Sequence, residues 1–142
     1  MATRNGSAEW RGDLKDGSGS LTVGDGVFQG DYSFSSRFEE GEGTNPEELI
    51  AAAHAACFAM ALSNILAEHG HPPESVNATA RVQLRPVDGA PTIARIDLDV
   101  QARVADIDEA HFQEHAKEAK AGCPVSRALA GVPEIELNAS LA

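Results

Sequence analysis

Two cysteines, Cys57 and Cys123, are the residues of this sequence best suited to covalent chemistry. Cys57 lies in the middle of the most apolar segment, where it is either a small buried hydrophobe or a nucleophile whose pKa a nearby cation must lower. Cys123 stands between Gly122 and Pro124, in position to cap a short helix whose partial positive charge favours a thiolate. Because the chain has only these two cysteines, in two such different settings, we interpret them as a redox pair.

A cation that activates Cys57 must come from another part of the chain. The cysteine lies about 12 residues beyond the expected helix start at Asn45, or about 18 Å along the axis, so the helix terminus is too distant to act on it. Arg37 is the nearest candidate in sequence, although a lone arginine at such a position is more often a solvated charge.

The helix that carries Cys57 is well signalled. Asn45 is a favoured N-cap, Pro46 suits the first helical position, and Glu48 completes a capping box. In residues 49–62 only His54 is strongly polar, so the helix is apolar on every side. A chain of this length has few elements to surround such a helix, and we therefore expect a homodimer in which a second copy packs against it.

The other elements follow from alternation and turn residues. Residues 76–84 and 94–104 alternate between apolar and polar side chains, which predicts a long antiparallel hairpin. The remaining expected elements are short strands over 21–23, 27–28 and 32–34, a loop over 39–44, helices over 108–120 and 124–131, and a strand over 135–141. Together they predict a single α+β domain over residues 1–142 with antiparallel sheet.

Composition excludes several classes of function. With 11 basic and 22 acidic residues, the net charge of -11 opposes binding to nucleic acid or to anionic membranes. The longest nearly apolar run, of about 14 residues, is shorter than the roughly 20 that cross a bilayer. No apolar signal core opens the chain, and two cysteines are too few for a disulfide framework, so we expect a cytoplasmic protein.

Three stretches of the sequence resemble the OsmC/Ohr family, and the OsmC branch more than the Ohr branch. They are residues 37–39 (RFE), 43–58 (GTNPEELIAAAHAACF) and 119–126 (AKAGCPVS). The resemblance implies an OsmC-like fold, with antiparallel sheets wrapped around central helices in an intertwined homodimer. It also implies a thiol-dependent peroxidase of the osmotic and oxidative stress response, which reduces organic hydroperoxides to alcohols without a metal or other cofactor.

The resemblance further implies roles for four residues. Cys57 is similar to the peroxidatic cysteine and Cys123 to the resolving one, while Arg37 matches the arginine that holds the thiolate and orients the peroxide. Glu47 matches the glutamate that positions this arginine. Attack on peroxide leaves a sulfenic acid on Cys57, which condenses with Cys123 to a disulfide, and a dithiol reductant, a lipoyl protein being one candidate, restores both thiols.

Helix geometry predicts that the site is shared between subunits. Glu47 and Cys57 are about ten residues apart on one helix, or about 15 Å along its axis, so an antiparallel partner helix is needed to bring them together.

The apolar neighbours of Cys57 favour bulky organic peroxides over hydrogen peroxide, although they also fit a role in the core. These neighbours are Leu49, Ile50, Phe58 and Met60.

Three other interpretations compete with the peroxidase. The stretch His111-Phe112-Gln113-Glu114-His115 has the H-x-x-E-H spacing of a zinc hydrolase, but the surrounding residues are typical of a solvated helix. His54 lies one helical turn before Cys57, which fits either a nucleophilic dyad or, more often, a buried histidine with a satisfied hydrogen bond. A dimer with an apolar groove could also bind lipophilic ligands without catalysis.

Overall fold

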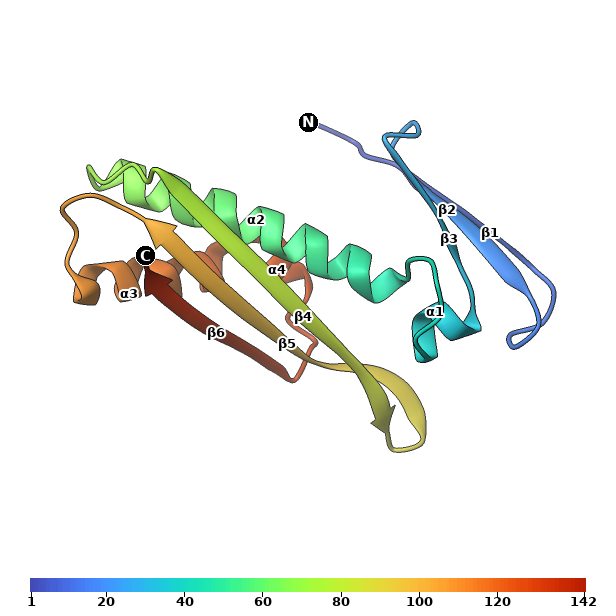
Figure 1. Cartoon of the computed structure of the whole chain (residues 1–142). Helices are drawn as coiled ribbons and strands as arrows, with labels where there is room; N and C mark the ends of the chain where they lie inside the picture. The colour runs from blue at the N-terminus through green and yellow to red at the C-terminus, as the bar shows by residue number, and fades with distance from the viewer. The chain divides into compact units, whose positions relative to one another are not determined.

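A three-stranded antiparallel sheet forms in the first part of the chain. In the computed structural model, which describes residues 1–142, the sheet contains strands β1 (Gly6–Arg11), β2 (Ser18–Val23) and β3 (Phe28–Tyr32), in that order (Figure 1). The sequence pattern indicated a strand at β2 but not β1, and it divided β3 into two strands, 27–28 and 32–34, because Gly30 and Asp31 resemble turn residues. The chain divides into two compact units, residues 1–49 and 50–142, and this sheet belongs to the first.

A one-turn helix, α1 (Phe34–Phe38), follows β3 where the sequence predicted the end of a strand. Ser33 terminates β3 and caps the helix, because its Oγ accepts a hydrogen bond from the Ser36 N–H at 3.1 Å. The Ser36 Oγ accepts one in return from the Ser33 N–H at 2.8 Å, which completes a capping box. The turn places Arg37 near the end of α1.

The long helix α2 (Pro46–Glu68) begins and ends as the sequence predicts. The Glu48 N–H donates to Asn45 Oδ1 at 2.8 Å, and the chain leaves the helix through Gly70, whose φ of +82° suits glycine. By length and composition alone α2 could span a membrane, which the shorter apolar run in the sequence did not suggest. Its fully buried Phe58, however, belongs to the core of the second unit.

The second sheet is mixed rather than antiparallel. Strands β4 (Ser75–Val87) and β5 (Ala90–Arg103) form the predicted antiparallel hairpin, whereas β6 (Glu134–Leu141) pairs parallel to β5. The expectation of a purely antiparallel sheet is wrong for this pair. The chain between β5 and β6 contains α3 (Glu109–Gly122) and α4 (Pro124–Ala128), and such a helical crossover returns the chain in the same direction.

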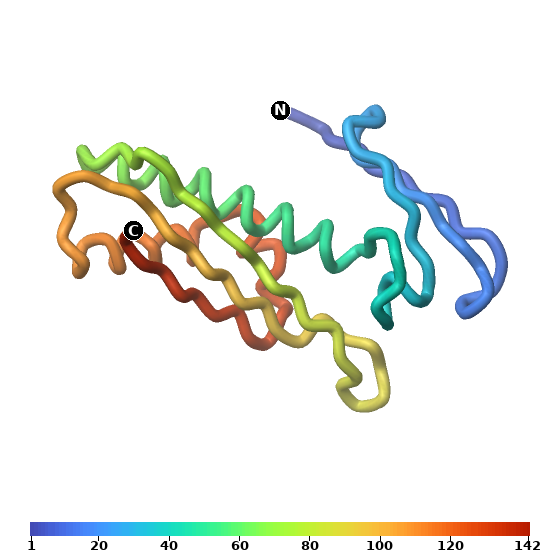
Figure 2. The backbone as a smooth tube through the Cα atoms, viewed as in Figure 1, coloured from blue at the N-terminus to red at the C-terminus, as the bar shows by residue number.

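The core of the second unit lies between the sheet and two helices. Alternate residues of β5 point to one face, as predicted, and α2 and α3 cover that face (Figure 2). Asp108 caps α3 through its Oδ1, which accepts a hydrogen bond from the His111 N–H at 2.8 Å. The buried core residues are Phe58, Leu62, Leu66, Leu98, Val100, Ala102, Phe112, Ala116, Ala119 and Ala139.

Candidate functional site

The two cysteines meet in the second unit. Their Sγ atoms lie 2.8 Å apart, although the two residues are 66 positions apart in the sequence, because the middle of α2 faces the start of α4. Both thiols are free, and only a small movement separates them from a disulfide bond of about 2.05 Å. Cys123 is fully buried while Cys57 is partly exposed, so a reagent from solvent reaches Cys57 first.

The two thiols have opposite electrostatic settings. Burial and the hydrogen bond with Cys123 raise the pKa of Cys57, against a weaker opposing effect of the Val125 N–H. Burial would also raise the pKa of Cys123, but hydrogen bonds from Cys57 and from Ser126 and Val125 lower it. No positive charge contributes to either shift, so activation of Cys57 requires a cation from outside this cluster.

Arg37 and Glu47 form a bidentate ion pair in the first unit. The Arg37 Nη2 lies 2.8 Å from Glu47 Oε1, and the Arg37 Nε lies 3.2 Å from both carboxylate oxygens. Glu47 is in the first turn of α2 and its side chain is 8% exposed, whereas that of Arg37 is 36% exposed. One edge of the guanidinium is thus bound by Glu47, and Nη1 makes no hydrogen bond. The predicted pairing of these two residues is present.

A largely apolar cavity of about 240 Å³ adjoins Arg37 in the same unit. Aromatic rings dominate its lining, and no sequence pattern groups them because they are scattered over β1, β3 and α1. The lining residues are Trp10, Leu14, Tyr32, Ser33, Phe34, Arg37 and Phe38. Of the apolar lining predicted from sequence, Phe58 is fully buried in the core and Met60 is 75% exposed. Phe58 therefore has the core role that its position also allowed.

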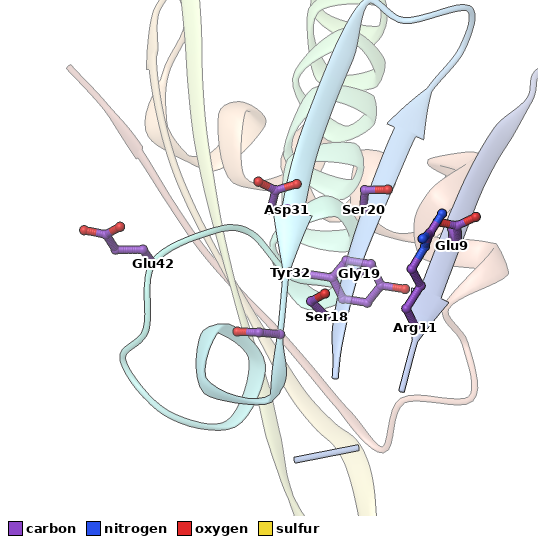
Figure 3. A pocket seen from close by; sticks show the side chains of 9 residues that line it. Glu9, Arg11, Ser18, Gly19, Ser20, Asp31, Tyr32 and Glu42 are labelled. Atoms are coloured by element: carbon purple, nitrogen blue, oxygen red, sulfur yellow. The ribbon is translucent and has the colours of Figure 1, made fainter. Parts of the chain in front are cut away.

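A second cavity, of about 410 Å³, lies over the first sheet (Figure 3). Its walls carry carboxylates and hydroxyls, and Arg11 is paired within it to Glu9 at 2.6 Å. It contains no thiol and no imidazole, so it lacks the groups needed for the chemistry indicated by the cysteines.

The H-x-x-E-H residues do not converge as metal ligands. The His111 Nδ1 lies 2.6 Å from Asp108 Oδ2, beside the start of α3, and His115 is buried with its ring centroid 4.3 Å from that of His69. No three His, Cys, Asp or Glu side chains are arranged to hold a metal ion. The geometry does not favour a hydrolase built on His111, Glu114 and His115. The expectation of a solvated helix is also incomplete, because α3 buries one of its faces in the core.

His54 is the buried, hydrogen-bonded histidine that the sequence favoured. It is fully buried, and its Nε2 lies 2.7 Å from the Oγ of Ser126. Ser126 was not identified from sequence. The sequence does contain one indication of its role. Ser126 lies one helical turn after Cys123, just as His54 lies one turn before Cys57.

Comparison with known proteins defines the family. Residues 39–138 match the family model described as OsmC-like protein. The chain is 49% identical over 127 residues to peroxiredoxin OsmC of Escherichia coli, covering 89% of each chain. It is 31% identical over 123 residues to the organic hydroperoxide resistance protein OhrB of Bacillus subtilis, covering 85% of this chain and 88% of the relative.

Solved structures show the same fold. An OsmC-like protein from Mycoplasma pneumoniae superposes with a TM-score of 0.75 at 18% identity, over 99% of this chain and 98% of the other. The structure of Bacillus subtilis OhrB gives a TM-score of 0.68 at 27% identity, over 97% and 98% of the two chains. The chain belongs to the OsmC-like family, as the resemblance indicated. Its sequence is more similar to OsmC than to OhrB.

Proposed function

We infer that this protein is a thiol-dependent peroxidase that reduces organic hydroperoxides to alcohols. The observation that carries this inference is the pair of free thiols 2.8 Å apart, one partly exposed and one buried. Relatives named peroxiredoxin and organic hydroperoxide resistance protein support the reaction and the substrate class. Neither metal-dependent hydrolysis nor passive ligand binding needs two thiols in contact.

In the reaction, Cys57 is the attacking thiolate. Its sulfur bonds to the terminal peroxide oxygen, which carries the hydrogen, and the O–O bond breaks. The other oxygen leaves as an alkoxide and takes up the proton that Cys57 has lost, which gives the alcohol. The resulting sulfenic acid on Cys57 condenses with Cys123 and releases water. A dithiol then reduces the disulfide by exchange, and a lipoyl protein is our candidate reductant.

Arg37 is the cation that Cys57 lacks within its own cluster. A guanidinium can stabilise the thiolate and the negative charge that develops on the departing oxygen. Glu47 holds one edge of Arg37 through two oxygens, which leaves the opposite edge for the peroxide. The adjoining aromatic cavity supplies an apolar setting for the organic group of the substrate.

The protein acts as a homodimer in this proposal. One face of α2 packs on the second sheet, while the opposite face remains uncovered and apolar. Its exposed apolar residues are Ala52, Ala53, Ala56, Met60 and Ala67. A second copy of the chain would remove this face from water, which is favourable. We place the dimer in the cytoplasm, where disulfides are usually transient and catalytic.

The test is consumption of cumene hydroperoxide in the presence of a dithiol reductant. Wild type should turn over, whereas Cys57→Ser should not, because a hydroxyl at its ordinary pKa is a far poorer nucleophile than a thiolate. A Ser63→Ala variant, which alters a hydroxyl elsewhere on α2, is the matched control and should retain activity. Substantial turnover by folded Cys57→Ser would reject the function, as would tight peroxide binding without consumption by wild type.

A further inference from the structure

His54 is a buried polar residue whose purpose the reaction above does not explain. It lies on α2 one helical turn before Cys57, is fully buried, and has its Nε2 2.7 Å from Ser126 Oγ. Its Nδ1 is buried without any hydrogen-bond partner. A polar ring in such an apolar helix costs free energy unless a specific contact offsets it, so the contact with Ser126 is the feature to explain.

Ser126 connects this histidine to the thiol pair. It lies one turn after Cys123 on α4 and is 7% exposed, and its hydroxyl and backbone N–H are among the groups that lower the pKa of Cys123. The Cys123 sulfur in turn lies 2.8 Å from the Cys57 sulfur. The helical turn from Cys123 to Ser126 on α4 thus places an imidazole–hydroxyl pair next to the pair of thiols.

The direction of the hydrogen bonds follows from the ring's unpaired nitrogen. Burial lowers the pKa of His54, so the ring is neutral and carries a single N–H. An unpaired N–H is rarer in protein interiors than an unpaired acceptor, which assigns the hydrogen to Nε2 and leaves Nδ1 as the bare nitrogen. The Nε2–H then donates to Ser126 Oγ, and the serine hydroxyl is free to donate to the sulfur of Cys123.

We propose that His54 and Ser126 are positioning residues, forming a hydrogen-bond relay that holds Cys123 as the thiolate that attacks the Cys57 sulfenic acid. This inference rests on the proposed peroxidase function. In the step, the Cys123–Cys57 sulfur–sulfur bond forms and the sulfur–oxygen bond of the sulfenic acid breaks. The departing hydroxide takes up the proton that Cys123 has lost and becomes water. The sulfenic sulfur is reduced and the Cys123 sulfur is oxidised.

The same relay directs reduction of the disulfide. An incoming thiolate can attack either sulfur, and the better-stabilised thiolate is the better leaving group. Cys123 is fully buried and held by Ser126, whereas Cys57 is partly exposed. The reductant therefore attacks Cys57, and Cys123 leaves as the thiolate.

The first experiment measures the thiolate of Cys123 without any peroxide. In a Cys57→Ser background, ultraviolet absorbance of the thiolate against pH gives the pKa of Cys123. Adding Ser126→Ala should raise this pKa, while Ser126→Thr, which keeps the hydroxyl, should restore it. His54→Leu should also raise it, and His54→Gln, whose amide N–H can replace Nε2–H, should raise it less. Ser63→Ala should have no effect.

The second experiment follows one turnover in the protein with both cysteines. After one equivalent of cumene hydroperoxide, Ser126→Ala should form the disulfide on the order of tenfold more slowly, the size expected for loss of a charge-assisted hydrogen bond. Trapping and mass spectrometry should show a longer-lived sulfenic acid on Cys57, and Ser126→Thr should recover the rate. An unchanged pKa of Cys123 with an unchanged disulfide rate in folded Ser126→Ala would overturn the relay. A wild type that consumes no peroxide would instead reject the proposed function, while the titration would still decide the relay.

Discussion

Glu47 binds Arg37 through both carboxylate oxygens, with Nη2 at 2.8 Å from Oε1 and Nε at 3.2 Å from each oxygen. The glutamate is buried and the arginine is only partly covered. Such a two-point contact fixes the plane of the guanidinium as well as its position. The free edge of Arg37 is therefore oriented before any substrate arrives.

Glu47→Gln should lower kcat/KM for cumene hydroperoxide on the order of a hundredfold, because a small displacement of a substrate-orienting group costs about that much. The amide can accept a hydrogen bond but has lost the charge that holds Arg37. Steady-state kinetics would measure the loss, and Glu48→Gln, at the exposed neighbouring position, should retain most of the activity. Equal activities of the two variants would contradict a role for Glu47 in orienting Arg37.

The cavity beside Arg37 predicts an effect on substrate choice. Leu14 lines it and is 60% exposed, so Leu14→Ala should not disturb the fold. Removing this side chain should raise KM for cumene hydroperoxide several-fold, since apolar contact with the organic group is lost, and leave hydrogen peroxide kinetics unchanged. Val27→Ala, exposed but outside the cavity, is the control. A parallel change for both peroxides would argue against the cavity as the substrate site.

Cys123→Ser should still react with the first equivalent of peroxide, because Cys57 is intact. Without the adjacent thiol, the sulfenic acid on Cys57 should persist and pass to sulfinic acid in excess peroxide. Mass spectrometry of the treated variant would show oxygen adducts on Cys57, whereas wild type should give a disulfide within one chain. A disulfide between subunits in wild type would show that the resolving thiol belongs to the partner.

The parts of the fold that the sequence predicted depend on local signals. Asn45 and Gly70 define the ends of α2, and strict alternation defines β4 and β5, because these features depend only on neighbouring residues. The direction of β6 could not be predicted in this way. Alternation identifies a strand but does not identify its partner, and the parallel pairing depends on the whole crossover through α3 and α4.

The site shows the same division between local and long-range information. Residue type and setting pointed to Cys57 and Cys123. Their separation of 66 positions in the sequence does not predict the distance between their sulfur atoms, because that distance depends on where the crossover places α4. The pairing of Arg37 with Glu47 was expected only from the family resemblance. Ser126 was missed because a serine in the first turn of a short helix is ordinary until the histidine beside it is known.

Buried His54 predicts a pH dependence of stability. Burial lowers the pKa of His54 in the folded state below the ordinary value of 6.5. As the pH falls below 6.5, the unfolded chain therefore takes up a proton at this residue more readily than the folded chain does. The contribution of neutral His54 to the free energy of unfolding is thus present above pH 6.5 and is lost below it. Urea unfolding at about pH 7.5 and pH 5.5 should show a larger loss of stability for wild type than for His54→Gln. The carboxylates titrate in both proteins, so their effect on stability cancels when the two losses are compared. An equal loss in the two proteins would contradict the lowered pKa.

The shared site is tested with mixed dimers. Glu47 precedes Cys57 by about ten residues on one helix, or about 15 Å along its axis, and Glu47 already binds Arg37 at the start of that helix. If two α2 helices pack antiparallel in a dimer, the start of one approaches the middle of the other, and Glu47 with its arginine serves the partner's Cys57. Both Cys57→Ser and Glu47→Ala homodimers should then be impaired.

Refolding an equal mixture of these two variants should restore one complete site in each heterodimer, because the intact Glu47 of one chain faces the intact Cys57 of the other. The expected activity is well above that of the Glu47→Ala homodimer alone, measured as cumene hydroperoxide consumption at equal total protein. If each site lies within one chain, no combination of these subunits brings an intact Glu47 to an intact Cys57. Activity that stays at the level of the Glu47→Ala protein, in a mixture shown by mass spectrometry to contain heterodimers, would therefore reject the shared site.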